Sequence, residues 1–282
     1  MNLTGRRESS NVDDRRGKKV VGTSLGIGGI IIAVVVALLM GKDPSTVIQN
    51  LGNSTTTETN YTPTAEEEEL ASFSKKILAG TEDVWTKEFK KMGKEYVPPK
   101  LVLFTNSVQS GCGGATSSTG PFYCSADQCV YIDLSFFSSM KKQFGTAGDF
   151  AYAYVIAHEV GHHVQYLLGT LSEAHNKMSR LSKTESNQIS VRLELQADFY
   201  AGVWAHQDNA MFNSLEDGDI EEGLAIAARI GDDYLQKQAQ GYSVPETFNH
   251  GTSAQRSRWL KKGISTGNIK DGDTFSPAYN QL

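Results

Sequence analysis

Residues 149–169 read DFAYAYVIAHEVGHHVQYLLG, and this stretch decides the fold. Its length and apolar character predict a helix, with Asp149 at the N-cap and Gly169 at the C-cap. Residues four apart share one face of a helix, so we expect His158 and His162 to lie side by side. The sequence therefore predicts a helix that carries two imidazoles on one face.

His158, Glu159 and His162 form the pattern H-E-x-x-H, which is typical of hydrolytic zinc sites. Neutral imidazole nitrogens suit Zn²⁺, and Glu159 follows His158 directly, where it can reach a water on the metal. These residue types at this spacing predict a zinc site in which Glu159 accepts a proton from that water.

A catalytic zinc also needs a third protein ligand and an open position for water. Glu194 and Asp198 are again four apart, in a largely apolar stretch that predicts a second helix. Acids buried in such a helix need partners. One carboxylate can bind zinc while the other accepts a hydrogen bond from the second nitrogen of a ligand histidine. The spacing leaves open which carboxylate has which role.

The rest of the chain predicts an α+β, mainly helical fold with a small β-sheet. Besides the stretch at 149–169, helices are predicted over 65–92, 185–206 and 220–238 and in a short segment after Thr252 and Ser253. Short β-rich runs predict strands at 101–105 and 130–134. We expect the folded domain to span residues 65–282.

An uncharged apolar stretch, residues 20–40, precedes that domain. At about 1.5 Å per residue it is long enough for the roughly 30 Å hydrocarbon core of a bilayer. It exceeds a signal-peptide core and no A-x-A-like cleavage site follows, which favours one uncleaved transmembrane helix. Residues 1–19 are basic, so we expect this tail in the cytoplasm and everything after residue 41 outside the inner membrane.

The composition is that of an ordinary folded chain. Of 282 residues, 39% are hydrophobic and 21% are charged, and the net charge of -5 argues against a nucleic-acid partner. Residues 41–64 are rich in Thr, Asn and Ser and are expected to be a flexible linker. Three cysteines are too few for a disulfide-dense scaffold.

Several long blocks resemble one family. HEVGHHVQ at 158–165 and ELQADFYAGVWAH at 194–206 look like the membrane-anchored neutral zinc metallopeptidases of bacteria. GRRESSNVDDRRG at 5–17, SGCGGATSSTGPFYCSADQCVYIDLSFF at 110–137 and VPETFNHGTSAQRSRWLKKG at 244–263 are similar to other parts of that family. The resemblance implies a zincin-like peptidase domain. As in the wider gluzincin peptidases, it implies Glu194 as third zinc ligand and Asp198 as the partner of a ligand histidine.

The resemblance also bears on the cysteines. Cys112 and Cys124 fit a central cysteine pair of the family, and outside the membrane they are expected to form a disulfide. Cys129 is left over, either as a free thiol or as a competitor for that pairing. The resemblance implies cysteines where Phe199 and Gly272 stand, and the absence of both here is what a lost disulfide would look like.

The family-like block at 244–263 contains His250, just before a predicted helix start. Two roles are open for it: stabilising the oxyanion of a tetrahedral intermediate, or fixing a local turn. Arg256 and Tyr154 are further candidates for the oxyanion role.

Together these observations predict a single-pass, membrane-anchored zinc metalloendopeptidase. Zn²⁺ would be held by His158, His162 and Glu194, with Glu159 as the base. Its partners would be a membrane and a peptide or protein substrate. By analogy with other zincins, a strand near 130–133 would pair edge-on with extended substrate. The alternative is a non-catalytic, zinc-stabilised envelope module that binds a partner protein, although a structural site would need no base.

Overall fold

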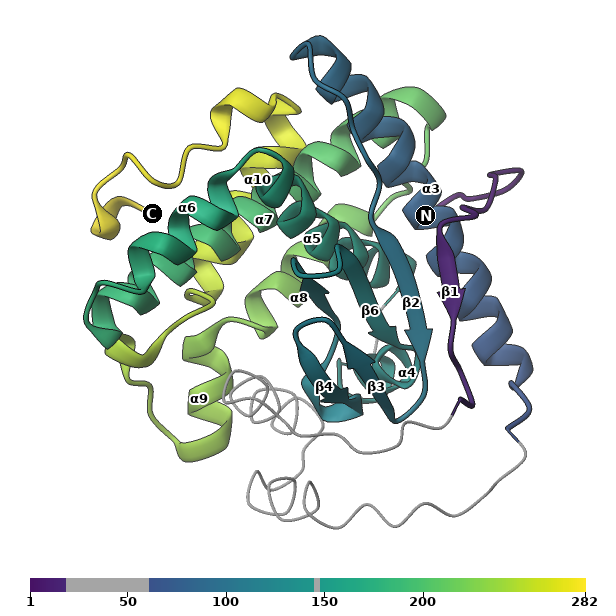
Figure 1. The fold of residues 1–282 in the computed structure, drawn as a ribbon, viewed down its shortest axis with the longest axis horizontal. Coiled ribbons are helices and arrows are strands. Elements are labelled where there is room, and N and C mark those ends of the chain that lie inside the picture. Colours follow the sequence, from purple (N-terminus) through teal and green to yellow (C-terminus); the bar gives the residue numbers. More distant parts are fainter. Residues whose placement is uncertain (19–60, 145–147) are drawn as a thin grey trace. The chain divides into compact units, whose positions relative to one another are not determined.

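The computed structural model describes residues 1–18, 61–144 and 148–282, which are mainly helical with small sheets (Figure 1). The chain divides into two compact units. The first comprises residues 1–6, 77–98 and 148–282, and the second comprises the described parts of 7–76 and 99–147. The predicted α+β, mainly helical class is confirmed.

The second unit contains a four-stranded sheet in the order β1-β2-β6-β5. Its strands are β1 (Val12–Asp14), β2 (Lys100–Phe104), β5 (Phe122–Cys124) and β6 (Cys129–Asp133). β1, β2 and β6 run parallel, and β5 pairs antiparallel with β6. The strands predicted at 101–105 and 130–134 are confirmed, each displaced by one residue.

β6 is an interior strand of this sheet. Residues 129–131 pair with β2 on one side and with β5 on the other. A substrate strand needs an unpaired row of backbone N–H and C=O groups, which only an edge strand offers. The prediction of edge-on substrate pairing near 130–133 is therefore wrong.

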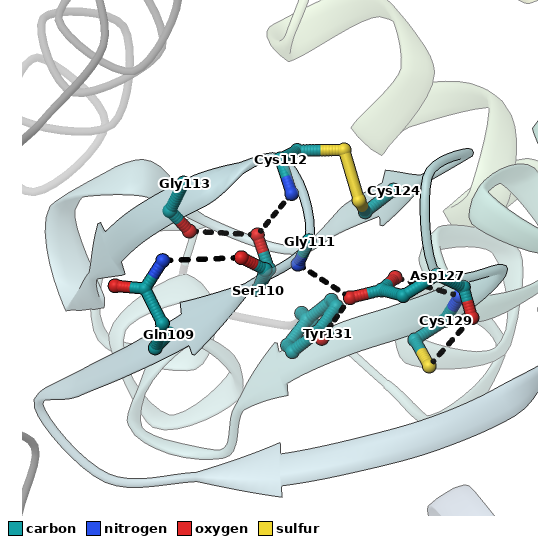
Figure 2. Close-up of a disulfide and its surroundings, with 9 residues drawn as sticks. All are labelled: Gln109, Ser110, Gly111, Cys112, Gly113, Cys124, Asp127, Cys129 and Tyr131. Atoms are coloured by element: carbon teal, nitrogen blue, oxygen red, sulfur yellow. Dashed lines mark hydrogen bonds between the residues drawn. A yellow bond between two sulfur atoms is a disulfide. The ribbon is translucent and has the colours of Figure 1, made fainter.

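A two-stranded hairpin follows β2 and is formed by β3 (Ser107–Ser110) and β4 (Gly113–Thr116). Cys112 in its turn is bonded to Cys124 of β5, as Figure 2 shows, so the predicted disulfide is confirmed. Closing a loop of this length stabilises the fold by about 3 kcal/mol in the chain-entropy description. Cys129 is a buried free thiol whose pKa is raised by burial and by the charge of Asp127.

Residues 1–18 are part of the folded structure. β1 pairs with β2, and the backbone N–H of Leu101 donates to the carbonyl of Asn11 at 2.8 Å. In the first unit, the Arg6 guanidinium bonds both carboxylate oxygens of Asp208 at 2.8 and 3.2 Å and lies 3.7 Å from the Phe212 ring centre. The predicted tail is therefore not separate from the fold, and its location relative to a membrane stays a prediction.

The predicted transmembrane helix, 20–40, and most of the predicted linker, 41–64, lie outside the described residues. None of the helices described is long and apolar enough to cross a membrane. Thr64 is the last residue of the predicted linker; its hydroxyl accepts the backbone N–H of Glu67, and the Glu67 carboxylate accepts the N–H of Thr64. This capping box starts α3 (Ala65–Lys91), which confirms the helix predicted over 65–92.

The other helices follow the sheet. They are α4 (Ser135–Phe144) in the second unit and, in the first unit, α5 (Asp149–Leu167), α6 (Thr170–Met178), α7 (Lys183–Phe212), α8 (Asp219–Arg229), α9 (Asp232–Gln240) and α10 (Ser253–Thr266). The helix predicted over 149–169 is confirmed, but its caps are Gly148 and Leu168, so the predicted caps, Asp149 and Gly169, are each one residue too late. α7 is longer than the predicted 185–206, since Ser182 and Glu185 form a capping box at its start. α4 and α6 have no counterpart in the sequence prediction.

The prediction of one helix over 220–238 is wrong, because the helical structure is interrupted at residues 230–231, between α8 and α9. A Cβ on Gly231 would lie 2.3 Å from the backbone nitrogen of Ser253, so no side chain fits there. The carboxylate of Asp232, the next residue, accepts the backbone N–H groups of residues 249–251 at 2.7 to 2.9 Å. These hydrogen bonds connect the start of α9 to the loop before α10.

Glycines bring α7 close to both α5 and α10. A Cβ on Gly161 of α5 would lie 3.0 Å from the backbone oxygen of Ala197 on α7. A Cβ on Gly263 of α10 would lie 2.1 Å from the backbone oxygen of Phe199. Larger residues would separate these helices, which Figure 1 shows packed together. The close approach sets H-E-x-x-H against the segment that carries Glu194.

Phe199 also lies against Gly272. A Cβ on Gly272 would meet a Phe199 ring carbon at 2.5 Å. The two positions at which the family resemblance implies cysteines are therefore neighbours here, and the phenylalanine ring fills the space of a second side chain. The interpretation of a lost disulfide stays a prediction.

Candidate metal centre

His158, His162 and Glu194 come together where α5 packs on α7. Nε2 of His158 lies 3.2 Å from Oε2 of Glu194, and Nε2 of His162 lies 3.5 Å from Oε1 of the same carboxylate. One ligand atom from each residue lies within 4.8 Å of the other two. The structure thus joins residues that the sequence separates by more than thirty positions.

The spacing of these atoms fits zinc. Zinc binds imidazole nitrogen and carboxylate oxygen at about 2.0–2.2 Å, so two ligands at a tetrahedral angle lie about 3.3–3.6 Å apart. Each nitrogen is close to this distance from one oxygen of the carboxylate: His158 is 3.2 Å from Oε2 and His162 is 3.5 Å from Oε1. Two histidines and one carboxylate leave a fourth position for water, as in catalytic zinc sites.

The charges around His158 also favour a cation. Its Nδ1 lies 2.8 Å from Oδ1 of Asp198, and its Nε2 faces Glu194. Burial alone would lower the pKa of His158, but the two carboxylates outweigh burial and raise the pKa to about 10. The site therefore attracts positive charge, which a divalent metal ion supplies while the imidazole stays neutral.

Asp198 lies behind His158, on the side away from Glu194. It is fully buried and accepts hydrogen bonds from Tyr154 Oη at 2.6 Å and from Arg256 Nε and Nη2, both at 2.9 Å. Burial alone would raise the pKa of Asp198, but the charges of Arg256 and His158 outweigh burial and lower it. The structure therefore separates two roles that the spacing left open: Glu194 faces both Nε2 atoms, and Asp198 holds His158 from behind.

Tyr154 and Arg256 do not fit the oxyanion role. Both side chains are almost fully buried, and Arg256 Nη2 also lies 3.2 Å from the Tyr154 hydroxyl. Burial is the largest cause of the raised pKa of Tyr154, so the phenol stays protonated. Because their polar groups are engaged with Asp198, these two candidates are wrong.

His250 is held by Asp232. Its Nδ1 lies 3.1 Å from Oδ1 of Asp232, and 22% of its side chain is exposed. Burial alone would lower the pKa of His250, but the charges of Asp232 and Glu194 and the hydrogen bond to Asp232 outweigh burial and raise it. Within the described part of the chain Nε2 of His250 has no hydrogen-bond partner. The ring is thus fixed at one nitrogen and available at the other.

Glu159 follows His158 on α5 and is only 9% exposed. Among residues 1–18, 61–144 and 148–282 its carboxylate has no hydrogen-bond or ion-pair partner. Because no described residue bonds to this carboxylate, its oxygens are available to accept a proton.

Three polar residues around the site were not predicted from the sequence. Asp232 holds His250, Gln165 lies 2.9 Å from Nδ1 of His162, and Gln196 bonds Gln165. The position of Gln165, three residues after His162 on one helix, is a signal that could have identified it. The contacts of Asp232 and Gln196 join distant parts of the chain and have no local signal.

Comparison with known proteins agrees with this geometry. A family model described as "Putative neutral zinc metallopeptidase" matches residues 1–275. YpfJ of Escherichia coli (strain K12) is 47% identical over 285 residues, which cover 98% of this chain and 99% of YpfJ. Rv2575 of Mycobacterium tuberculosis is 44% identical over 193 residues, covering 65% and 64% of the two chains. No solved structure matches. The chain therefore belongs to the neutral zinc metallopeptidase family that this model describes.

Proposed function

We propose that the chain is a zinc-dependent metalloendopeptidase that hydrolyses peptide bonds at the His158, His162 and Glu194 centre. The observation that carries this proposal is the convergence of ligand atoms from His158, His162 and Glu194, which lie within 4.8 Å of one another. Glu159 follows the first of these ligands directly on α5, and its carboxylate has no partner within the described residues. A zinc ion bound there would act as a Lewis acid toward water and a peptide carbonyl.

The side chains around the centre have distinct tasks in this proposal. Glu159 takes a proton from the attacking water and passes it to the leaving amine. His250, fixed through Nδ1 by Asp232, donates from Nε2 to the carbonyl oxygen as negative charge develops there. Asp198 accepts the Nδ1 proton of His158, so that Nε2 presents its lone pair to the metal.

Metal removal tests the proposal. The purified full chain should cleave members of a peptide library, since zinc and Glu159 together activate water. A zinc chelator should reduce cleavage to background, and added zinc should restore it, with products followed by mass spectrometry. Cleavage that persists without metal would contradict the proposed mechanism. A chain that binds zinc but cleaves no peptide would support the non-catalytic module instead.

We also propose that residues 20–40 attach the chain to the inner membrane and that the described residues lie outside the cytoplasm. The stretch is apolar and uncharged, which favours its burial in lipid, and both of its ends lie on one face of the membrane if it inserts from that face without crossing. Residues 1–6 belong to the same unit as residues 148–282. This proposal therefore keeps the N-terminal residues on the same side as the metal centre.

Cysteine labelling tests this topology. Thr4 and Lys261 are exposed, so Thr4→Cys and Lys261→Cys, each combined with Cys129→Ser, report on the N-terminal segment and on α10. A membrane-impermeant maleimide should label both in intact spheroplasts. If only Lys261→Cys is labelled, the N-terminus lies in the cytoplasm, as the sequence predicted. That result would contradict the contacts of residues 1–6 with the rest of their unit. Protection of both would place the metal centre in the cytoplasm.

A further inference from the structure

The two histidines of the metal centre have different partners at Nδ1. His158 faces the carboxylate of Asp198, whose charge is matched by Arg256. His162 instead faces the amide oxygen of Gln165 at 2.9 Å. A neutral amide has a donor end and an acceptor end, so it can fix the proton on His162 only if its own orientation is fixed.

Two neighbouring groups fix the orientation of Gln165. Its Nε2 donates to the backbone carbonyl of Leu193 at 2.8 Å and to Oε1 of Gln196 at 3.1 Å. The amide nitrogen of Gln196 donates in turn to the backbone carbonyl of Gly272 at 2.9 Å. Backbone carbonyls only accept hydrogen bonds, so each amide nitrogen must face its carbonyl.

Rotating either amide by half a turn would place oxygen against oxygen inside the protein. Gln165 is fully buried and Gln196 is 6% exposed, so water cannot relieve such a contact. An unmatched buried polar group is costly, and the cost applies to both glutamines because one bonds the other. Oε1 of Gln165 is therefore left as an acceptor toward His162.

We propose that Gln165 is a positioning residue, held by Gln196 and the Leu193 and Gly272 carbonyls, that keeps the proton of His162 on Nδ1. The lone pair of His162 Nε2 is then directed toward Glu194, 3.5 Å away. The inference rests on the proposed zinc centre and extends it to the segment after α10, where Gly272 lies. It assigns a role to the last residue of HEVGHHVQ.

Zinc affinity of the full chain tests this role. Gln165→Met keeps the length of the side chain without the amide and should weaken zinc binding roughly 10–100-fold in competition with a chelator. Gln196→Met should weaken it less, because the Leu193 carbonyl still orients Gln165. The matched control is Gln207→Met: Gln207 is also on α7 and donates to the backbone carbonyl of Gly267 at 2.8 Å. It should bind zinc as tightly as the parent.

A second measurement separates positioning from general packing. In the zinc-loaded chain, the Nδ1 proton of His162 should be visible by NMR and slow to exchange, and in Gln165→Met it should exchange roughly tenfold faster or more. Equal zinc affinity and equal proton exchange in the parent and Gln165→Met would overturn the positioning role alone. A parent chain that binds no zinc would overturn the proposed function, and this inference with it.

Discussion

Replacing Glu159 by Gln is expected to lower peptide hydrolysis by roughly 10²–10⁴-fold, the usual contribution of a general base. The amide keeps the shape of the side chain but cannot take a proton from the attacking water. Glu159 makes no ion pair or hydrogen bond within the described residues, so its replacement should leave zinc content and thermal stability unchanged. Steady-state kinetics on a chromogenic peptide, with zinc content measured on the same sample, give the result.

The control for this experiment is Glu173→Gln, on the neighbouring helix α6. Glu173 is exposed, so the same chemical change should have no effect on hydrolysis. A Glu159→Gln variant that cleaves as fast as the parent would remove Glu159 from the mechanism. It would also show that the cleavage arises at another site or from a contaminant.

Replacing Arg256 by Met is expected to destabilise the zinc-free chain by about 3–5 kcal/mol, because it leaves a buried carboxylate without its main counter-charge. Asp198 is fully buried and Arg256 is 3% exposed, so water cannot take over the lost contacts. His158 and Tyr154 still bond Asp198, which keeps the variant foldable. Urea unfolding in the presence of chelator measures the change in the free energy of unfolding.

Two further variants make this result specific. Arg258→Met, two residues along α10 at an exposed position, should change stability by no more than about 0.5 kcal/mol. The double variant Arg256→Met with Asp198→Asn should lose less stability than the sum of the single changes, because the unmatched charge is then absent. Additive losses, or a loss under about 1 kcal/mol for Arg256→Met, would show that the pair is not the buried ion pair described here.

Much of the candidate site could be predicted because its geometry is local. The four-residue spacings of His158 and His162 and of Glu194 and Asp198 each put two side chains on one helix face, whatever surrounds the helix. The meeting of the two helices depends on the close approach at Gly161, which the periodicity does not reveal. The expectation that these two helices meet came from the family resemblance.

The parts that could not be predicted depend on contacts between distant segments. The break at Gly231 follows from the nearness of Ser253 and from the bonds of Asp232 to residues 249–251. The charges of residues 1–19 suggested a tail, whereas in the fold Arg6 bonds Asp208 and residues 12–14 pair with β2. Local sequence patterns report on neither kind of contact.

The oxyanion candidates fail for the same reason. Arg256 and Tyr154 carry suitable hydrogen-bond donors, and the sequence shows no competing partner for them. In the fold both bond Asp198, so their donors face the interior. His250 keeps an available nitrogen because Asp232, on another helix, bonds only Nδ1.

Anomalous diffraction at the zinc edge, from crystals of the zinc-loaded full chain, tests the metal centre most directly. We expect one strong peak within about 2.0–2.2 Å of His158 Nε2, His162 Nε2 and a carboxylate oxygen of Glu194. Asp198 should remain on Nδ1 of His158 and Glu159 should remain off the metal. A peak bound by Asp198 in place of Glu194, or one located away from His158 and His162, would contradict this expectation.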